Sequence, residues 1–82
     1  MIDRKWQEIV TRRLNEKFKE KDITQKYLSD LSGVPASRIY NYLHARVFPR
    51  GDDIEKIAEV LDTTSDYLFG FDEYCYNGRK EK

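Results

Sequence analysis

The sequence predicts an all-α protein of five short helices. Apolar residues recur at three- and four-residue intervals, which is the spacing of a helix face, and no stretch alternates as a half-buried strand would. The length of 82 residues suits one small domain and not two. We therefore expect one domain over residues 1–70, followed by a tail or the start of a linker over residues 71–82.

The first helix is predicted to follow Asp3, whose carboxylate can accept a hydrogen bond from a free backbone amide at the helix start. Lys17, Lys19 and Lys21 lie at its expected C-terminal end, where they oppose the negative end of the helix dipole. The apolar stripe of this helix consists of Trp6, Ile9, Val10, Leu14 and Phe18.

The second helix is predicted to start after Thr24 and to end near Gly33. The Thr24 hydroxyl can cap it, and Ile23 can pack on Leu28 as a hydrophobic staple. Gly33 fits the left-handed turn that ends a helix. Pro35 suits the start of the next helix, because a proline needs no amide partner there.

The third helix, expected over residues 35–44, has two different faces. Ile39, Tyr42 and Leu43 fall on one side at helical spacing, and we expect that side to be buried. The opposite stripe is polar and uncharged, and the segment around it, residues 31–51, contains arginines but no acidic residue. The stripe consists of Ser37, Tyr40, Asn41 and His44, and the arginines are Arg38, Arg46 and Arg50.

A fourth helix is predicted from Asp52, with Glu55 completing an approximate capping box, and a single-turn fifth helix is predicted after Thr64. Tyr67 and Leu68 of the fifth helix are expected to close the core. The fourth helix is expected to bury Ile54, Ile57, Ala58 and Leu61.

Charge is unevenly distributed along a chain whose net charge is zero. Residues 52–73 contain eight acidic side chains and one basic side chain, in contrast to the acid-free segment before them. We expect the acids to face away from that segment and to orient the molecule toward a negatively charged partner. A purely solubilising role for the acids predicts the same placement. The acids are Asp52, Asp53, Glu55, Glu59, Asp62, Asp66, Asp72 and Glu73.

Composition argues against several classes of protein. Cys75 is the only cysteine and cannot close an internal disulfide, and one histidine gives no spacing typical of a zinc site. Ser37 and His44 lie two helical turns apart, too far for proton transfer, so we expect neither an enzyme nor a bound cofactor. No small-molecule ligand is evident. The chain has no apolar run that could span a membrane and no signal peptide, so we expect a cytoplasmic protein.

The polar stripe of the third helix has the chemistry to read base edges. Hydroxyl and carboxamide groups can donate and accept hydrogen bonds in a major groove, while flanking arginines pair with phosphates. A polar stripe alone is also typical of any solvated surface helix. Its position after a short helix and a tight glycine turn favours double-stranded DNA as the partner, because this arrangement places one helix in the groove.

The stretches "ITQKYLSDLSGVPASRIYNYL" and "FPRGDDIEKIAEVLDTTSDYLFG" combine a TQxxL opening, a GV turn and a terminal DYL. Through them, residues 23–70 resemble the phage repressor and Cro type of helix-turn-helix, the XRE family. The resemblance implies a lambda-repressor-like five-helix bundle in which the second and third helices form a DNA-binding motif. It also implies that Gln25 contacts a phosphate and that Arg38 and Tyr40 touch bases or backbone. The resemblance further implies that the family positions facing the bases are occupied here by Ala36, Ser37 and Asn41. The positions that bind phosphates are occupied by His44, Arg46 and Arg50.

Several positions depart from the family pattern. Many members pair an arginine in the slot of Phe18 with a glutamate in the slot of Leu43. Here both residues are apolar, and we predict that they touch, because packed hydrocarbon can replace a buried ion pair without loss of stability. Ala45 and Asp62 occupy slots where glycine is usual, and Pro35 replaces the usual serine cap.

The function that the resemblance implies is a repressor that binds a roughly palindromic DNA operator as a homodimer. Two alternatives stay open: a protein-interaction module of the antitoxin or anti-repressor type, and the N-terminal part of a larger repressor with a peptidase or dimerisation domain. The aromatic residues near the C-terminus are expected to pack back on the core, or else to pair with a second copy. They are Phe69, Phe71, Tyr74 and Tyr76.

Overall fold

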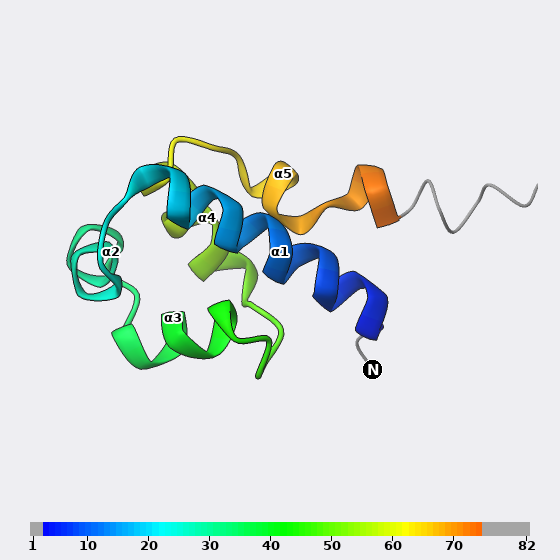
Figure 1. Ribbon diagram of the computed structural model, residues 1–82, viewed down its shortest axis with the longest axis horizontal. Coiled ribbons are helices and arrows are strands. Elements are labelled where there is room, and N and C mark those ends of the chain that lie inside the picture. Colours follow the sequence, from blue (N-terminus) through cyan, green and yellow to red (C-terminus); the bar gives the residue numbers. More distant parts are fainter. Residues whose placement is uncertain (1–2, 75–82) are drawn as a thin grey trace, which may run out of the picture.

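The computed structural model describes residues 3–74, and all the regular structure in that range is helical. Its helices are α1 (Arg4–Lys21), α2 (Gln25–Ser32), α3 (Ala36–Leu43), α4 (Gly51–Val60) and α5 (Ser65–Phe69). A further helical turn follows at residues 71–74 (Figure 1). The predicted all-α, five-helix architecture is therefore confirmed.

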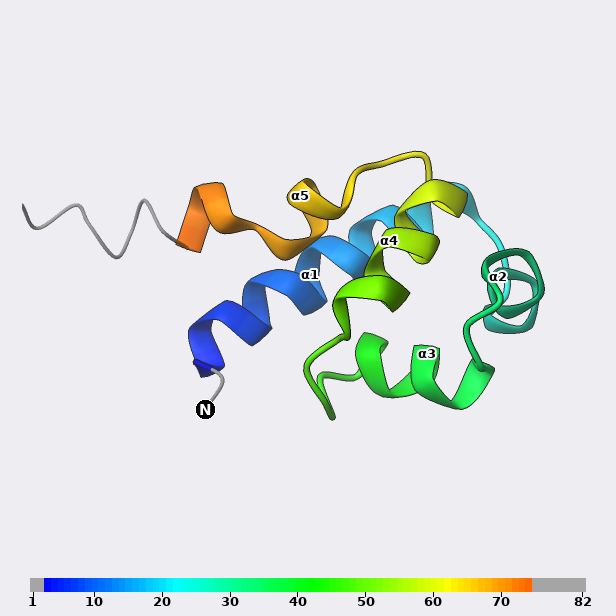
Figure 2. The same ribbon diagram turned by 180° about the vertical axis from the view of Figure 1, so that it is seen from behind.

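The helices enclose one apolar core. α2 packs against α3 and α4, whereas α1 packs against α3 and α5, and α4 also contacts α5. Seen from behind, α4 lies in front of α1, while α3 stays at the lower edge in both views (Figure 2). The apolar face predicted for α3 and the one predicted for α4 are buried, as expected. The central cluster contains Leu14, Leu28, Val34, Ile39, Tyr42, Leu43, Ile54, Ile57, Ala58, Leu61 and Leu68.

Three of the predicted N-terminal caps are present. The Asp3 carboxylate accepts a hydrogen bond from the backbone N–H of Lys5 at 2.8 Å. The hydroxyl oxygens of Thr24 and Thr64 accept hydrogen bonds from the backbone N–H groups of the residues three positions later, at 3.0 and 3.1 Å. Each cap satisfies an amide that has no partner within its own helix.

The predicted start of the fourth helix is wrong by one residue, and the capping box does not form. Arg50 has the extended backbone of an N-cap residue, and Gly51 is already helical. Asp52 therefore lies inside the first turn, where its carboxylate accepts a hydrogen bond from the N–H of Asp53 instead of capping the helix. The two carboxylates still lie at the positive end of the helix dipole, where negative charge is favourable.

The two positions where the family usually has glycine have a left-handed backbone here as well. Ala45 has φ 57° and Asp62 has φ 58°. After α3, the N–H of Ala45 donates to the carbonyl of Tyr42, and the N–H of Arg46 donates to the carbonyl of Asn41. These paired bonds form a Schellman motif, which normally has glycine at the left-handed position. The turn after α3 is thus retained with a less favourable residue.

The slots that hold an ion pair in many relatives are filled by hydrocarbon. Leu43 belongs to the buried core cluster, and Phe18 packs against that cluster while half-buried. The helices that carry them, α1 and α3, pack together. A direct contact between the two side chains stays a prediction.

The aromatic residues after α5 pack onto the start of α1. The Trp6 ring lies 5.2 Å from the Phe71 ring and 5.3 Å from the Tyr74 ring, and its indole N–H donates to the carbonyl of Phe69 at 2.7 Å. Packing back on the core is confirmed for Phe69, whereas Phe71, which is 45% exposed, and Tyr74 pack on the Trp6 ring. Tyr76 and Cys75 lie outside the described residues.

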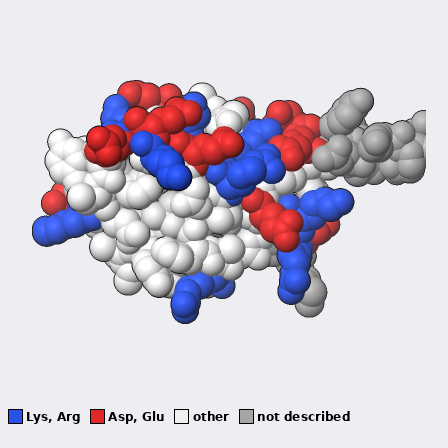
Figure 3. Space-filling model, in the orientation of Figure 1, with Lys and Arg blue, Asp and Glu red and all other residues white. Residues whose placement is uncertain are grey.

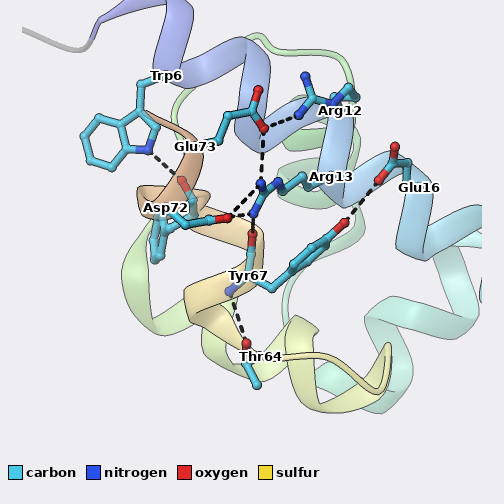
Figure 4. A network of polar contacts seen from close by, with 9 residues as sticks. Trp6, Arg12, Arg13, Glu16, Thr64, Tyr67, Asp72 and Glu73 are labelled. Carbon is cyan, nitrogen blue, oxygen red and sulfur yellow. Dashed lines mark hydrogen bonds and ion pairs between the residues drawn. The ribbon is translucent and has the colours of Figure 1, made fainter. Parts of the chain in front are cut away.

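A buried arginine, which the sequence analysis did not anticipate, connects α1 to the C-terminal turn. Only 8% of Arg13 is exposed. Its guanidinium donates to the carbonyl of Tyr67 at 2.9 Å and forms ion pairs with Asp72 and Glu73 (Figure 4). The expectation that Tyr67 would be buried is wrong, because its ring instead covers the guanidinium from outside, 4.5 Å away.

Candidate nucleic-acid interface

The turn between α2 and α3 fixes how α3 is presented. α2 ends at Gly33, whose φ of 81° is in the left-handed region as predicted. Val34 then inserts into the core, and Pro35 starts α3 without a side-chain cap. Because Ile39 is buried on the same side as Val34, the opposite side of α3 is turned outward.

The outward side of α3 contains the polar stripe that the sequence predicted. Ala36, Ser37, Tyr40 and His44 are exposed, whereas Arg38 and Asn41 are partly buried. Arg46 and Arg50 are exposed in the segment that follows. Gln25, the first residue of α2, is partly buried. The structure thus brings most of the predicted residues to one continuous surface on and after α3, with Gln25 at the start of the neighbouring helix.

Three side chains at the C-terminal end of this surface are stacked. The rings of Tyr40 and His44 lie 4.0 Å apart, and the guanidinium carbon of Arg46 lies 5.6 Å from the centre of the Tyr40 ring. The Nδ1 atom of His44 is 2.9 Å from the carbonyl oxygen of Tyr40. Because a carbonyl can only accept, this hydrogen bond requires the proton on Nδ1.

Two polar residues of α1, which the sequence analysis missed, hold the end of α3. The Asn15 side-chain amide donates to the carbonyl of Leu43 at 3.0 Å, and the Gln7 amide donates to the carbonyl of Ala45 at 3.0 Å. These bonds satisfy carbonyls that the helix itself leaves free. In the sequence, Gln7, Thr11 and Asn15 are spaced four residues apart and lie beside the apolar stripe of α1. This spacing could have indicated a structural role for Gln7 and Asn15.

The acids are less segregated from the predicted DNA contacts than expected. Asp52 lies beside Arg50, with 3.4 Å between Oδ1 and Nε, and both side chains are exposed. Arg50 must therefore exchange this partner for a phosphate if it binds one. On the larger scale, the lower surface over α3 shows blue groups at its edge and no red, whereas red groups gather on the upper side (Figure 3).

Arg38 and Asp53 form an ion pair between α3 and the start of α4. The Nε atom of Arg38 lies 3.2 Å from Oδ2 of Asp53, and the Tyr42 hydroxyl donates to the same oxygen. Asp53 and Tyr42 are each only 1% exposed. Burial, together with the hydrogen bond to Asp53, raises the pKa of Tyr42, so the hydroxyl keeps the proton that it donates. The expectation that all acids face away from α3 is wrong for Asp53.

Two short helices at a tight turn, with an exposed polar second helix, define a helix-turn-helix domain. A family model described as helix-turn-helix (HTH_3) matches residues 14–68, which is more than half of the chain. The chain belongs to this family, which is the Cro/C1 or XRE type.

Membership makes the chain a DNA-binding regulator of the XRE type, and the family is a regulatory family rather than an enzyme family. No curated protein and no solved structure matched the chain. None of the helices in residues 3–74 is long and apolar enough to cross a membrane.

Proposed function

We propose that the protein is a cytoplasmic repressor that binds a roughly palindromic DNA operator as a homodimer, with α3 in the major groove. The observation that carries this proposal is the exposed polar face of α3, which has no acid on it and is flanked by arginines. A surface that approaches phosphates must lack exposed negative charge, and one that reads bases must offer hydrogen-bonding groups.

Each residue has a role that its exposure permits. Ser37 and Asn41 donate to or accept from base edges, and the methyl group of Ala36 can meet a thymine methyl. Arg46 and Arg50 neutralise phosphates, helped by His44 and by Gln25 at the start of α2. Tyr40, whose ring stacks on His44 and lies near the Arg46 guanidinium, contacts the backbone or a base edge at the rim of the groove.

Dimerisation would let two copies of α3 enter successive major grooves. These grooves are about 34 Å apart on one side of the duplex, so a palindrome with half-sites one helical turn apart matches a two-fold dimer. A dimer bound over a promoter blocks polymerase, which is the reason for proposing repression.

The experiment is selection of binding sites from a random duplex library, followed by titration of the enriched duplex and a scrambled duplex at several salt concentrations. We expect a palindrome, with affinity that falls steeply with salt because neutralised phosphates release counterions. Failure to enrich any sequence, with weak binding at low salt, would contradict the proposal.

Two variants separate base contacts from phosphate contacts. Asn41→Ala should weaken binding to the enriched duplex more than to the scrambled one, whereas Arg46→Ala should weaken both and lower the salt slope by about one. Lys19→Ala is the matched control, because it removes an exposed cation from the last turn of α1, away from α3 in Figure 1. Equal losses from Asn41→Ala on both duplexes would remove its role as a base reader.

A second candidate function is that of a protein-interaction module. Tyr27 and Leu31 lie one turn apart on α2 and are 52% and 53% exposed, so one face of the helix presents two large apolar side chains to solvent. If no duplex is enriched and a protein partner binds with little dependence on salt, this function replaces DNA binding.

A further inference from the structure

We propose that Asp53 is a positioning residue, which holds the guanidinium of Arg38 so that its free edge recognises a guanine instead of clamping a phosphate. This inference rests on the proposed function, since it assigns a ligand to one residue of the same surface. It concerns the ion pair between α3 and α4.

The guanidinium of Arg38 donates one hydrogen bond to Asp53, from Nη2, and its Nε atom lies close to the carboxylate without donating to it. Arg38 Nε lies 3.2 Å from Oδ2, and Arg38 Nη2 lies 3.4 Å from Oδ1. The hydroxyl of Tyr42 donates to Oδ2, which fixes the carboxylate from the core side. An arginine side chain normally samples many rotamers, and here its outer end is tied to a buried group.

Burial of Asp53 is opposed by desolvation, which its place at the positive end of α4 offsets only in part. Removing a carboxylate from water is unfavourable, and an apolar residue at such a position is often neutral or stabilising. The neighbours of Asp53 in the core cluster, Ile54 and Ile57, show that this end of α4 accepts hydrocarbon. Orientation of Arg38, whose side chain is 41% exposed, is an effect that hydrocarbon could not supply.

The remaining donors of Arg38 then have one fixed direction. Of the five guanidinium N–H groups, one on Nη2 donates to Asp53, and the buried Nε group has no hydrogen-bond acceptor. The two groups on Nη1 and the second group on Nη2 are left to meet a ligand. A planar pair of donors matches the O6 and N7 acceptors of guanine in the major groove. The nearby carboxylate also offsets the positive charge, so Arg38 gains little from a phosphate at an arbitrary sequence.

The test compares Asp53→Asn with the wild-type protein on the enriched and scrambled duplexes. Asparagine has nearly the same shape but no charge, so Arg38 is released and its full charge becomes available. We expect the ratio of the two affinities to fall by about tenfold. We also expect the salt slope on the scrambled duplex to become steeper by up to about one. An unchanged ratio, or equal losses on both duplexes with an unchanged slope, would overturn the inference.

Two further variants exclude a purely structural effect. Tyr42→Phe frees the carboxylate without removing its charge, and it should lower the ratio by about threefold, as expected for one lost hydrogen bond. This variant replaces Asp53→Asn if thermal melts show that the latter is unfolded. In an Arg38→Ala background, Asp53→Asn should leave the ratio unchanged. A fall of similar size in that background would show that Asp53 does not act through Arg38, which refutes the proposal.

The outcomes also separate this inference from the proposed function. If the wild-type protein enriches no sequence, the proposed DNA-binding function is contradicted, and so is the role of Asp53 that depends on it. A wild-type protein that enriches a palindrome, with the same preference in Asp53→Asn, contradicts only the positioning of Arg38. If Arg38→Ala does not reduce the preference for a guanine in the enriched sites, the assignment of guanine as the ligand of Arg38 is contradicted.

Discussion

Replacing Arg13 with methionine tests how the buried guanidinium holds α1 to the C-terminal turn. The substitution removes a charged hydrogen bond of 2.9 Å to the Tyr67 carbonyl and the contact with the Tyr67 ring at 4.5 Å. Such contacts contribute about 1.5–3 and about 0.5–1 kcal/mol. Methionine recovers part of this lost free energy, because it carries no charge that must be removed from water. The Tyr67 carbonyl also keeps a partner, since it still accepts a hydrogen bond from the N–H of Gly70.

We therefore expect Arg13→Met to lower the free energy of unfolding by about 1–2 kcal/mol. For a domain of this size the melting temperature should fall by about 5–15 °C. Circular dichroism measures the global transition. Fluorescence of Trp6, the only tryptophan, reports on the C-terminal turn, because its ring stacks on Tyr74. An unchanged melting temperature and an unchanged Trp6 emission would refute the reasoning.

Arg12→Met is the matched control, because Arg12 also pairs with Glu73 but its side chain is 52% exposed. It should shift the melting temperature by no more than about 2 °C. Acid provides a second control. A hydrogen bond from Arg13 lowers the pKa of Asp72, and one from Arg12 lowers that of Glu73, from ordinary values of 3.8 and 4.5. Their small contribution is present above those values and is lost as the pH falls through the lowered pKa values, so part of the effect of Arg13→Met should disappear in acid.

Three other predictions concern the turns. Ala45→Gly should raise the melting temperature by about 2–6 °C in a thermal melt, because φ 57° is strained for alanine, and a lower value would contradict this. Gly70→Ala should lower the free energy of unfolding by at least about 2 kcal/mol, because φ is 65° and the new Cβ would collide with Ile9. Urea titration measures this loss, and an unchanged midpoint would contradict the structure. A hydrogen bond from Lys21 lowers the pKa of Asp62 from its ordinary value of 3.8. Asp62→Asn should therefore destabilise the protein slightly at pH 7, and this loss should disappear as the pH falls through the lowered pKa. A loss that persists in stronger acid would show another cause.

The predictions that came true from sequence were those that depend on neighbours along the chain. The caps at Asp3, Thr24 and Thr64 join residues two or three positions apart, and the left-handed turn at Gly33 depends on one residue. The buried face of α3 also followed from spacing within one helix. The start of α4 was predicted one residue late, because Asp52 was expected to cap the helix and Arg50 occupies the N-cap position instead.

The exposure of the residues on α3 was predictable from the sequence, but their contacts were not. The exposure of Ser37 and His44 follows from the periodicity of α3, and the family match supports the motif. The constraint on Arg38 did not follow. Periodicity places Asp53, four residues before Ile57, on the buried face of α4, but it does not identify Arg38 as the partner of that carboxylate.

The sequence by itself determined five helices, their order, the core faces of α3 and α4 and the acid-free polar stripe of α3, because all of these depend on periodicity and on interactions within about four residues. Only the tertiary structure decided which charges are buried. Arg13 meets the Tyr67 carbonyl across 54 positions of sequence, and Arg38 meets Asp53 across 15. A buried charge requires a partner in space, and local patterns along the chain carry no record of where that partner lies.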